Sequence, residues 1–410
     1  MPLDTRTSNF ILLGIVIAIV LAFASVALFG EAMASVEWLG TLFLKALKMI
    51  IVPLVTASMI VGVAGLGDVR KLGRLGGNAI LYFVVTTGIA VAIGLLMVNL
   101  IRPGDGISIG ELAVPAHVAA KEDFALSDLV LSLVSDNIVA SMANLELLPI
   151  IVFSLVFGAV LTTLGPVGAP VIAFFRGVNE AIMKMVMLLM LVAPIGIFGL
   201  VAGRFGRAGD IGQVIGGVGW YMATVLLALS LHAAVVLPAI LWFVGRRNPY
   251  RYMFNMGTAL LTAFSTASSS ATLPLTMEGV EKHNGVSEKV AGFVVPLGAT
   301  INMNGTALYE AVAALFIAQA IGLDLTLGQQ VMVLLTATLA AIGAAGIPEA
   351  GLVTMVIVLK AVGLPLEGIG LILAVDWLLD RFRTSVNVWG DAVGAAVVEQ
   401  RVLDGSRDET

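Results

Sequence analysis

Cysteine is absent from this 410-residue sequence, and charged residues are scarce. Without cysteine the chain has no disulfide, no thiolate nucleophile and no cysteine-ligated metal. Charged residues make up 12% of the chain, against roughly 25% in soluble domains, and hydrophobic residues make up 59%. A soluble fold of this length cannot bury so much apolar surface, so we expect a protein embedded in a lipid bilayer.

Recognisable catalytic motifs are also missing. The sequence has no HExxH, GxSxG or Walker A motif and no histidines at metal-ligand spacing. The formal net charge of −5 argues against a nucleic-acid partner. We therefore expect neither an enzyme nor an ATP-driven pump, and no prosthetic cofactor.

Apolar segments long enough to cross a membrane recur along the chain. The first of them is too long for the core of a cleavable signal peptide, so we interpret it as a membrane helix. Two further stretches are interrupted by small, polar or proline residues. The uninterrupted segments are 9–29, 38–66, 78–101, 128–164, 170–202, 211–245, 287–321 and 366–399, and the interrupted ones are 253–277 and 327–361.

Positive charges predict the orientation of these segments. They cluster after the second and sixth spans, on the N-terminal side of the membrane, which is then cytoplasmic by the positive-inside rule. The polar connection 102–127 is then extracytoplasmic. Arg204 and Arg207 fall on the opposite side and count against this orientation. The supporting residues are Arg70, Lys71, Arg74, Arg246, Arg247 and Arg251.

The two interrupted stretches share one spacing. Leu260–Ala263 precedes Pro274 by the same interval at which Leu334–Ala337 precedes Pro348. Irregular backbone within hydrocarbon leaves polar groups unpaired, so such segments persist only against protein or a wet cavity. Paired interrupted segments are typical of transporter binding sites. The alternative is two ordinary spans with flexible centres.

The last span carries a polar stripe. At about 100° per residue, its members fall within about 60° of Asp380 on one helix face. Ionisable groups inside a span mark solute or ion paths. The alternatives are a structural ion-pair network and a helix lying flat at the membrane surface. The stripe consists of Asp376, Asp380, Arg383, Thr384, Asn387 and Asp391.

The side chains of this stripe suit a zwitterionic solute. Arg383 can hold a carboxylate through two parallel hydrogen bonds, and Asp380 can pair with an ammonium group. Asn387 offers both a donor and an acceptor. The sequence gives Asp391 no nearby basic residue, so it is left to bind a cation or a proton. We leave Asp376 without a role.

Polar residues also interrupt the segment 287–321. Asn302, Asn304, Gly305 and Thr306 predict an unwound turn, whose exposed carbonyls are good ligands for a hard cation. Glu310 follows in the same helix, and a lone carboxyl in hydrocarbon favours its protonated form and could carry a proton. The alternative is a neutral glutamate bonded to a neighbouring helix.

The first interrupted stretch contains the sequence STASSSATLP. Its serine hydroxyls and backbone amides could hold a carboxylate. The alternative is a serine-rich turn. In the sixth span we interpret His232 as a packed core residue rather than a proton relay.

Four motifs resemble the glutamate transporter family, the dicarboxylate/amino acid:cation symporters that include the excitatory amino-acid transporters. They are SSSATLP, NMNGTALYEA, GIPEAGLVTM and DWLLDRFRTSVNVWGD, in this order, within a resemblance that covers nearly the whole chain. The resemblance implies an all-α integral membrane fold of eight transmembrane helices and two re-entrant helical hairpins with inverted repeats.

The resemblance also implies a homotrimer of elevator-type protomers, in which a transport domain moves against a scaffold. The scaffold is expected at 1–77 and 128–207. The transport domain is expected at 78–127 and 208–400, with hairpins near 253–278 and 327–361, and 401–410 is a polar tail.

The resemblance assigns roles to individual residues. Arg383 matches the arginine that holds the side-chain carboxylate, Asp380 the residue that holds the amino group, and Glu310 a proton-carrying glutamate. The implied solute contacts are Ser268, Ser269, Ser270, Thr306, Ile347, Pro348, Ala350, Gly351, Asp380, Arg383, Thr384 and Asn387. The implied sodium ligands are Gly298, Asn302, Asn387 and Asp391 at one site and carbonyls around Thr300, Met303 and the second hairpin tip at another.

One position departs from the family pattern. Asn304 stands where the family commonly has the aspartate of NMDGT, which helps to bind a third sodium with the pair matched by Thr86 and Thr87. Losing the carboxylate removes a formal charge, so we expect this site to be weak or absent. Our hypothesis is that the protein couples to fewer sodium ions or substitutes protons through Glu310.

The sequence therefore predicts a symporter that moves L-aspartate or L-glutamate with Na⁺, H⁺ or both. The alternatives are a C4-dicarboxylate symporter of the same fold and an anion-conducting channel. We expect a multi-pass protein of the cell membrane, in a prokaryotic inner membrane, with lipid as its surroundings.

Overall fold

A computed structural model describes residues 5–65, 73–107, 131, 133–144, 146–207, 211–342 and 350–407. All regular structure in these residues is helical. The α-helices are α1 (Thr5–Phe29), α2 (Glu37–Ala64), α3 (Gly73–Ile101), α6 (Ile138–Asn144), α7 (Leu147–Thr163), α8 (Ala169–Arg207), α9 (Ile211–Leu231), α10 (Leu237–Phe243), α11 (Pro249–Asn255), α12 (Gly257–Thr266), α13 (Ser269–Glu278), α14 (Glu288–Ile301), α15 (Asn304–Ala320), α16 (Leu327–Ile342), α17 (Ala350–Ala361) and α18 (Ile369–Arg407). Short 3₁₀ or π segments are η1 (Gly30–Val36), η3 (Gly165–Val167), η4 (His232–Val236), η5 (Gly279–His283) and η6 (Leu366–Gly368).

Several of these helices are long and apolar enough to cross a membrane. Among the described residues there are four such helices, or five if the bent pair Gly165–Val186 and Leu191–Gly203 forms one span. The last helix, α18, is long enough, but the charges of its polar stripe lower its hydropathy. The predicted total of eight spans therefore stays a prediction. The four helices are Leu13–Phe43, Gly73–Ile101, Gly216–Phe243 and Glu288–Ala320.

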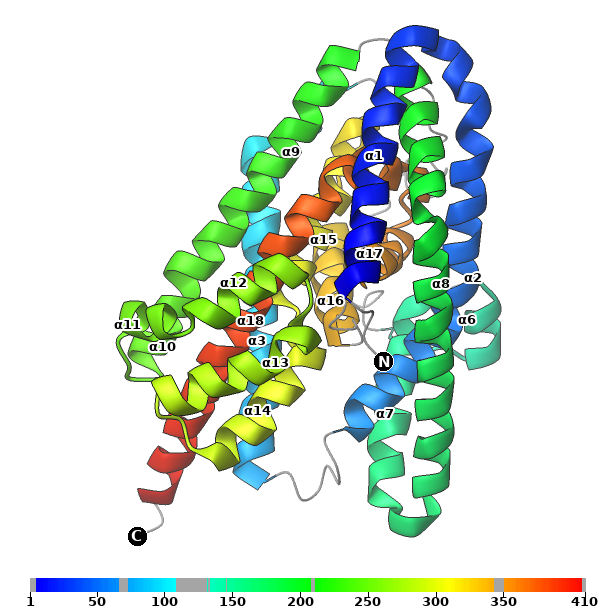
Figure 1. Ribbon diagram of the computed structural model, residues 1–410. Helices are drawn as coiled ribbons and strands as arrows, with labels where there is room; N and C mark the ends of the chain where they lie inside the picture. Colours follow the sequence, from blue (N-terminus) through cyan, green and yellow to red (C-terminus); the bar gives the residue numbers. More distant parts are fainter. Residues whose placement is uncertain are drawn as a thin grey trace.

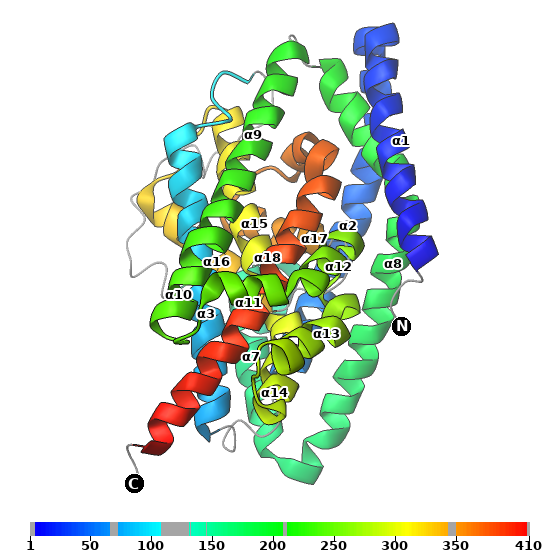
Figure 2. The same ribbon diagram turned by 60° about the vertical axis from the view of Figure 1, so that its left-hand side comes forward.

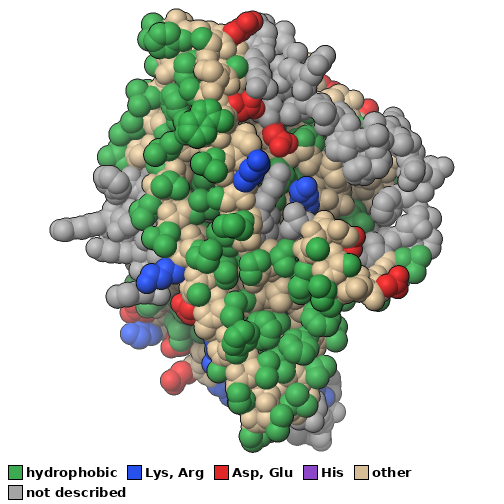
Figure 3. Space-filling model, turned by 90° about the vertical axis from the view of Figure 1, so that its right-hand side faces the viewer, with side chains coloured by type: hydrophobic (Ala, Val, Ile, Leu, Met, Phe, Trp, Pro, Cys, Tyr) green, Lys and Arg blue, Asp and Glu red, His purple; other side chains and the backbone are tan. Residues whose placement is uncertain are grey.

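The helices form two groups. On one side α2 packs along α8, with α1 against α8 and α7 against α2 (Figures 1 and 2). On the other side α15 packs against α3 and α18, and α9 covers α3 and α18. Figure 3 views the molecule from the side where α2 and α8 lie, and hydrophobic side chains dominate its described surface. Such a surface is suited to lipid.

The two interrupted stretches form two helical hairpins, and the structure describes the connecting turn of the first one only. In the first, α12 ends at Thr266 and α13 begins at Ser269. Ala267 between them adopts the left-handed conformation at φ 48°, and the Ser268 side chain caps α13 by accepting from the amide of Ala271 at 3.2 Å. In the second, α16 and α17 pack together, and their connection, 343–349, lies outside the described residues.

The break expected in the segment 287–321 is present but shorter than expected, because Asn304, Gly305 and Thr306 form the first turn of α15 rather than an unwound turn. α14 ends at Ile301, α15 begins at Asn304, and Asn302 and Met303 between them have non-helical backbone angles. Every residue of α15 is buried. This break therefore lies inside the protein, where unpaired backbone groups can meet protein partners rather than hydrocarbon.

Candidate solute and ion site

Arg383 of α18 is the most deeply buried cation among the described side chains, with none of its surface exposed. Its Nη2 donates to Asp380 Oδ1 at 2.9 Å, and its Nη1 lies 3.1 Å from Asp376 Oδ1. Removing a guanidinium from water is costly unless opposite charges compensate, and these two carboxylates supply them. Asp376, which the sequence left without a role, is therefore a second counterion of the arginine.

An aromatic ring completes the surroundings of this arginine. The guanidinium carbon lies 3.8 Å from the ring centroid of Tyr309 in α15. At that distance the ring face attracts the cation, most strongly where water is excluded. Sequence reasoning missed Tyr309. Its position three residues after Thr306, on the same helix face, is the signal that could have found it.

The second hairpin also reaches this arginine. A Cβ added at Gly351, in the first turn of α17, would stand 2.9 Å from Arg383 Nη1. The glycine therefore allows α17 to approach the guanidinium closely. Of the other residues predicted in this hairpin, Ile347 and Pro348 lie outside the described residues. Ala350 begins α17, and its side chain is likewise outside them.

Asn387 joins α18 to the break between α14 and α15. Its Oδ1 accepts from the Gly305 amide at 2.7 Å, and its Nδ2 donates to Thr306 Oγ1 and to Met303 Sδ, each at 3.3 Å. Gly305 is needed there, because a Cβ would stand 2.6 Å from the Arg383 carbonyl oxygen. One amide thus connects the predicted solute residues to the predicted ion residues.

Asp391, one helical turn further along α18, lies against the other side of the break. It is 1% exposed, and its Oδ1 accepts from Asn302 Nδ2 at 2.8 Å. The Asn302 Oδ1 atom is buried without a hydrogen-bond partner among the described residues. A carboxylate and a free amide oxygen are ligands that a hard cation such as Na⁺ prefers. Gly298 packs directly on this carboxylate.

The other predicted site residues differ in burial. Thr384 is 5% exposed, whereas Thr300 is exposed and its hydroxyl bonds back to the Leu297 carbonyl at 2.8 Å. In the first hairpin, Ser268 and Ser269 are buried and Ser270 is exposed.

Arg381 connects α18 to the first hairpin. Its Nη1 donates to the carbonyls of Phe264 and Ser265, at 3.0 and 2.7 Å. These carbonyls belong to the last turn of α12. The partial negative charge at this end of the helix also attracts the guanidinium. Arg381 and Arg383 are thus two residues apart but perform separate tasks.

Glu310 is wholly buried in α15 and has one recorded side-chain partner. The hydroxyl of Thr354 in α17 donates to its Oε1, while its Oε2 has no partner among the described atoms. The structure places this buried carboxyl against a neighbouring helix, which fits both a proton-carrying carboxyl and a neutral glutamate bonded to that helix, so the proton-carrier role stays a prediction. It also adds Thr354, which sequence reasoning did not select because a single threonine in an apolar helix carries no signal.

Asn304 belongs to a neutral hydrogen-bond network. Thr87 Oγ1 donates to Asn304 Oδ1 at 2.7 Å, and Asn304 Nδ2 lies 3.4 Å from His232 Nε2. Thr86 uses its hydroxyl on the Tyr82 carbonyl at 2.7 Å. His232, expected to be a packing residue, is fully buried, and it also contacts Asn304 at the start of the π-helical turn η4. The Thr87 hydroxyl and the Asn304 amide thus pair with each other, the Thr86 hydroxyl pairs with the backbone, and His232 Nδ1 is buried without a hydrogen-bond partner among the described residues.

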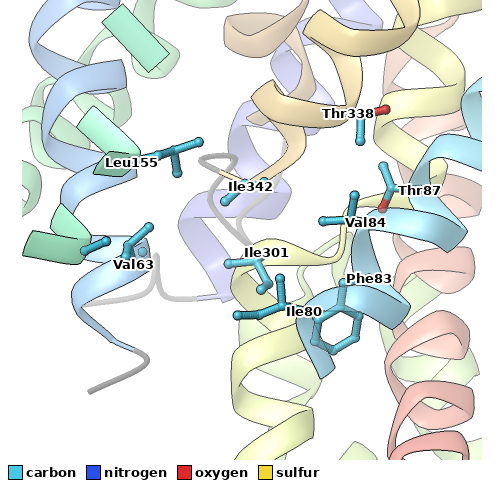
Figure 4. A pocket seen from close by; sticks show the side chains of 11 residues that line it. Val63, Ile80, Phe83, Val84, Thr87, Leu155, Ile301, Thr338 and Ile342 are labelled. Atoms are coloured by element: carbon cyan, nitrogen blue, oxygen red, sulfur yellow. The ribbon is translucent and has the colours of Figure 1, made fainter. Parts of the chain in front are cut away.

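An apolar cavity of about 290 Å³ lies between the two groups of helices (Figure 4). Val63 of α2 and Leu155 of α7 line one side of it. Ile80 and Phe83 of α3 and Ile342 of α16 line the other side. The two groups therefore meet here through apolar side chains without close packing.

Comparison with known proteins places the chain among membrane transporters. Residues 8–401 match the model of the sodium:dicarboxylate symporter family. Excitatory amino acid transporter 3 of Homo sapiens is 41% identical over 450 aligned positions, which cover 96% of this chain and 86% of the relative. The similarity therefore extends over almost the full length of both proteins.

Two further relatives differ in their named solutes. Excitatory amino acid transporter 1 of Ambystoma tigrinum is 41% identical, covering 88% of this chain and 76% of the relative. Neutral amino acid transporter B(0) of Homo sapiens is 40% identical, covering 92% and 76%. These relatives are animal proteins and lend no support to a prokaryotic membrane. The family match, the helical fold and the buried polar site agree: the chain is a multi-pass membrane protein that belongs to the sodium:dicarboxylate symporter family.

Proposed function

We propose that this protein is a symporter that carries L-aspartate or L-glutamate across the membrane together with sodium ions. The observation that carries the proposal is the wholly buried Arg383, held between two carboxylates beside a helix break. A buried cation with exchangeable counterions is a receptor for an anionic group. The side-chain carboxylate of the solute then replaces one of the two carboxylates that pair with Arg383. The ammonium group of the solute pairs with Asp380.

Asn387 provides the coupling between solute and ion. It binds the Gly305 amide and the Thr306 hydroxyl, and Asp391 follows it one turn later on α18. A sodium ion at Asp391, Asn302 and Gly298, with a second among carbonyls around Thr300 and Met303, neutralises buried acid and stiffens the break. Solute then meets a preorganised Asn387 and Thr306, so each ligand raises the affinity of the other.

We propose that coupling uses fewer sodium ions than a carboxylate at position 304 would allow. The Thr87 hydroxyl and the Asn304 amide are engaged in a neutral network that requires no cation. Glu310 is the acidic residue of α15, and the Thr354 hydroxyl donates to it. A proton carried by Glu310 would take the place of a sodium ion.

The proposed architecture has eight spans and two hairpins in each protomer of a trimer. The scaffold contains α1, α2 and α6–α8, and the transport domain contains α3 and α9–α18. The loosely packed apolar cavity between the groups supports an elevator movement, because apolar contacts without directional bonds can slide. We place the protein in the cell membrane. Its assignment to a prokaryotic inner membrane stays a prediction.

The second candidate function is transport of C4-dicarboxylates, which the family description favours. Asp380 argues against it, because a buried carboxylate repels a solute that has no ammonium group. Competition by succinate against aspartate would distinguish the two functions directly.

The test is uptake of labelled L-aspartate into liposomes that contain the purified protein. A sodium gradient and a proton gradient are imposed separately, and the Hill slope for sodium is measured. We expect sodium to drive uptake with a low slope. A slope of about three, with no response to protons, would contradict the proposed coupling. Unaltered uptake by an Arg383→Ala variant would contradict the solute site itself.

A further inference from the structure

The corner between α10 and α11 exposes several aromatic side chains at the end of a membrane span. The apolar span Gly216–Phe243 ends there. Trp242 and Phe243 on α10 and Tyr250 and Phe254 on α11 are between 56% and 87% exposed. Large aromatic side chains at the end of a span are suited to the headgroup level of a bilayer, where one end is apolar and the other wet.

Two arginines stand among these aromatic residues. Arg246 and Arg251 are both exposed. Arg246 Nη1 lies 3.2 Å from Asp404 Oδ1 in an open pair that solvent screens, and no ion pair of Arg251 is recorded among the described residues. The corner therefore presents a surplus of positive charge beside apolar rings.

The α11 helix is fixed in the orientation that exposes these groups. Asn248 caps its first turn by accepting from the Arg251 amide at 3.0 Å. Tyr252 points inward, and its hydroxyl donates to the Ala392 carbonyl of α18 at 2.9 Å. Tyr250 and Phe254, four residues apart, share the opposite, outward face. Their exposure thus follows from the fastening of α11 to α18.

The third arginine of this corner points inward. Arg247 pairs with Glu399 of α18, and its guanidinium lies 5.9 Å from the Tyr252 ring centroid. Arg247 therefore stabilises the corner. Outside it, Arg246 shares its charge with Asp404, and Arg251 supplies the positive charge that this pair does not balance. Figures 1 and 2 show α10 and α11 together on the outer side of the helix bundle, away from α2 and α8.

We propose that this corner (Trp242, Phe243, Arg246, Tyr250, Arg251 and Phe254) binds the headgroups of anionic phospholipids. The aromatic side chains require an apolar partner at headgroup depth, which a soluble anionic protein does not offer. The arginines favour a partner with net negative charge. A zwitterionic lipid has no net charge, whereas an anionic lipid has one. Each arginine near an anionic membrane surface strengthens binding by roughly fivefold.

Binding at this corner affects the first hairpin, because α11 leads directly into α12. A bound headgroup fixes the depth of α11 in the membrane, and α12 follows it with a single residue between them. Anionic lipid is therefore expected to change the rate of solute uptake without changing the affinity for solute.

Trp242 supplies a native reporter for the test. The full-length protein is placed in vesicles that contain brominated phosphatidylglycerol or brominated phosphatidylcholine at equal mole fraction. Subtracting the signal of a Trp242→Phe variant isolates quenching at the corner. We expect stronger quenching by phosphatidylglycerol, and a preference that falls roughly fivefold in Arg251→Gln. The matched control is Lys282→Gln, which removes a charge already paired with Glu278 at 3.3 Å and should leave the preference unchanged.

Three outcomes would overturn the proposal. The first is equal quenching by both lipids. The second is an unchanged preference in Arg251→Gln. The third is displacement by water-soluble glycerol phosphate, which would assign the corner to free phosphate esters instead. Aspartate uptake by each variant confirms that it is folded. Because quenching does not depend on transport, a failure here is distinct from a failure of the proposed solute site.

Discussion

The surroundings of Arg383 and those of Asn304 are both buried at the break between α14 and α15, yet they differ in charge. Arg383 lies between Asp376 and Asp380, with Tyr309 beneath it. Asn304 lies between the Thr87 hydroxyl and the His232 ring, without a formal charge. One region is an ionic cluster, and the other is a neutral hydrogen-bond network.

The difference shows which region can exchange ligands. In the ionic cluster, two carboxylates share one guanidinium, and its Nε and Nη1 atoms have no hydrogen-bond partner among the described residues. An arriving carboxylate can form bonds that the cluster does not yet have. In the neutral network, the Asn304 side chain already contacts the Thr87 hydroxyl and the His232 ring. A cation would therefore have to break hydrogen bonds in order to bind there.

The largest expected effect comes from removing the arginine. Arg383→Ala should lose at least about 3 kcal/mol of aspartate binding, more than roughly a hundredfold in Kd, because two carboxylates are left unpaired. Neutral amino acids should bind relatively better. Calorimetric titration with aspartate and serine measures both effects.

The matched control for that variant is Arg381→Ala, which removes the neighbouring arginine that holds the end of α12. It should leave the preference for acidic over neutral solutes unchanged. Equal loss of that preference in both variants would mean that charge in general, rather than the position of Arg383, selects the solute.

Replacing Asp380, the acid that we propose holds the solute's ammonium group, should have the next largest effect. Asp380→Asn should weaken aspartate binding by about 2 kcal/mol, roughly thirtyfold, and should weaken succinate binding less or improve it. Competition of each compound against labelled aspartate measures the ratio. If both compounds lose affinity equally, Asp380 only positions Arg383.

Removing the ring beneath the arginine should have a similar or smaller effect. Tyr309→Leu should cost about 1–2 kcal/mol of solute binding, because a desolvated cation loses its contact with a π face. Tyr309→Phe retains the ring and should bind solute nearly as well as the original protein. A Phe variant as weak as the Leu variant would assign the effect to the hydroxyl instead.

Converting the neutral network into an ionic one should have the smallest effect and is the most direct test of the comparison. Asn304→Asp should raise the affinity for sodium by about 1 kcal/mol, roughly fivefold, and should increase the Hill slope of uptake. Asn304→Ser, which adds no charge, is the control. An unchanged slope in the Asp variant would mean that Thr86 and Thr87 do not form a cation site in this protein.

The sequence predicted the parts of the fold that follow from local pattern. The break at Asn302 and Met303 and the hairpin turn before Ser269 are where small and polar residues interrupt apolar runs. The polar face of α18 followed from helical periodicity alone. The helices α12 and α13 lie within the hairpin expected near 253–278.

The contacts between helices could not be predicted in this way. Tyr309 and Thr354 are single residues in apolar helices, and nothing local distinguishes them from packing residues. Asp376 was visible on the stripe, but its pairing with Arg383 depends on the rotamer of the arginine and on the approach of α15 and α17. The burial of Thr87 against Asn304 joins residues 217 positions apart.

By itself the sequence determined that the chain resides in a bilayer, where its helices are interrupted, and which charged groups share a face, because composition and periodicity act within one segment. Only the tertiary structure decided that two acids hold one arginine above a ring, and that Asn304 is satisfied without a cation. Burial makes each of these groups depend on partners from other helices, and an unpartnered charge or amide in that interior is too costly to persist.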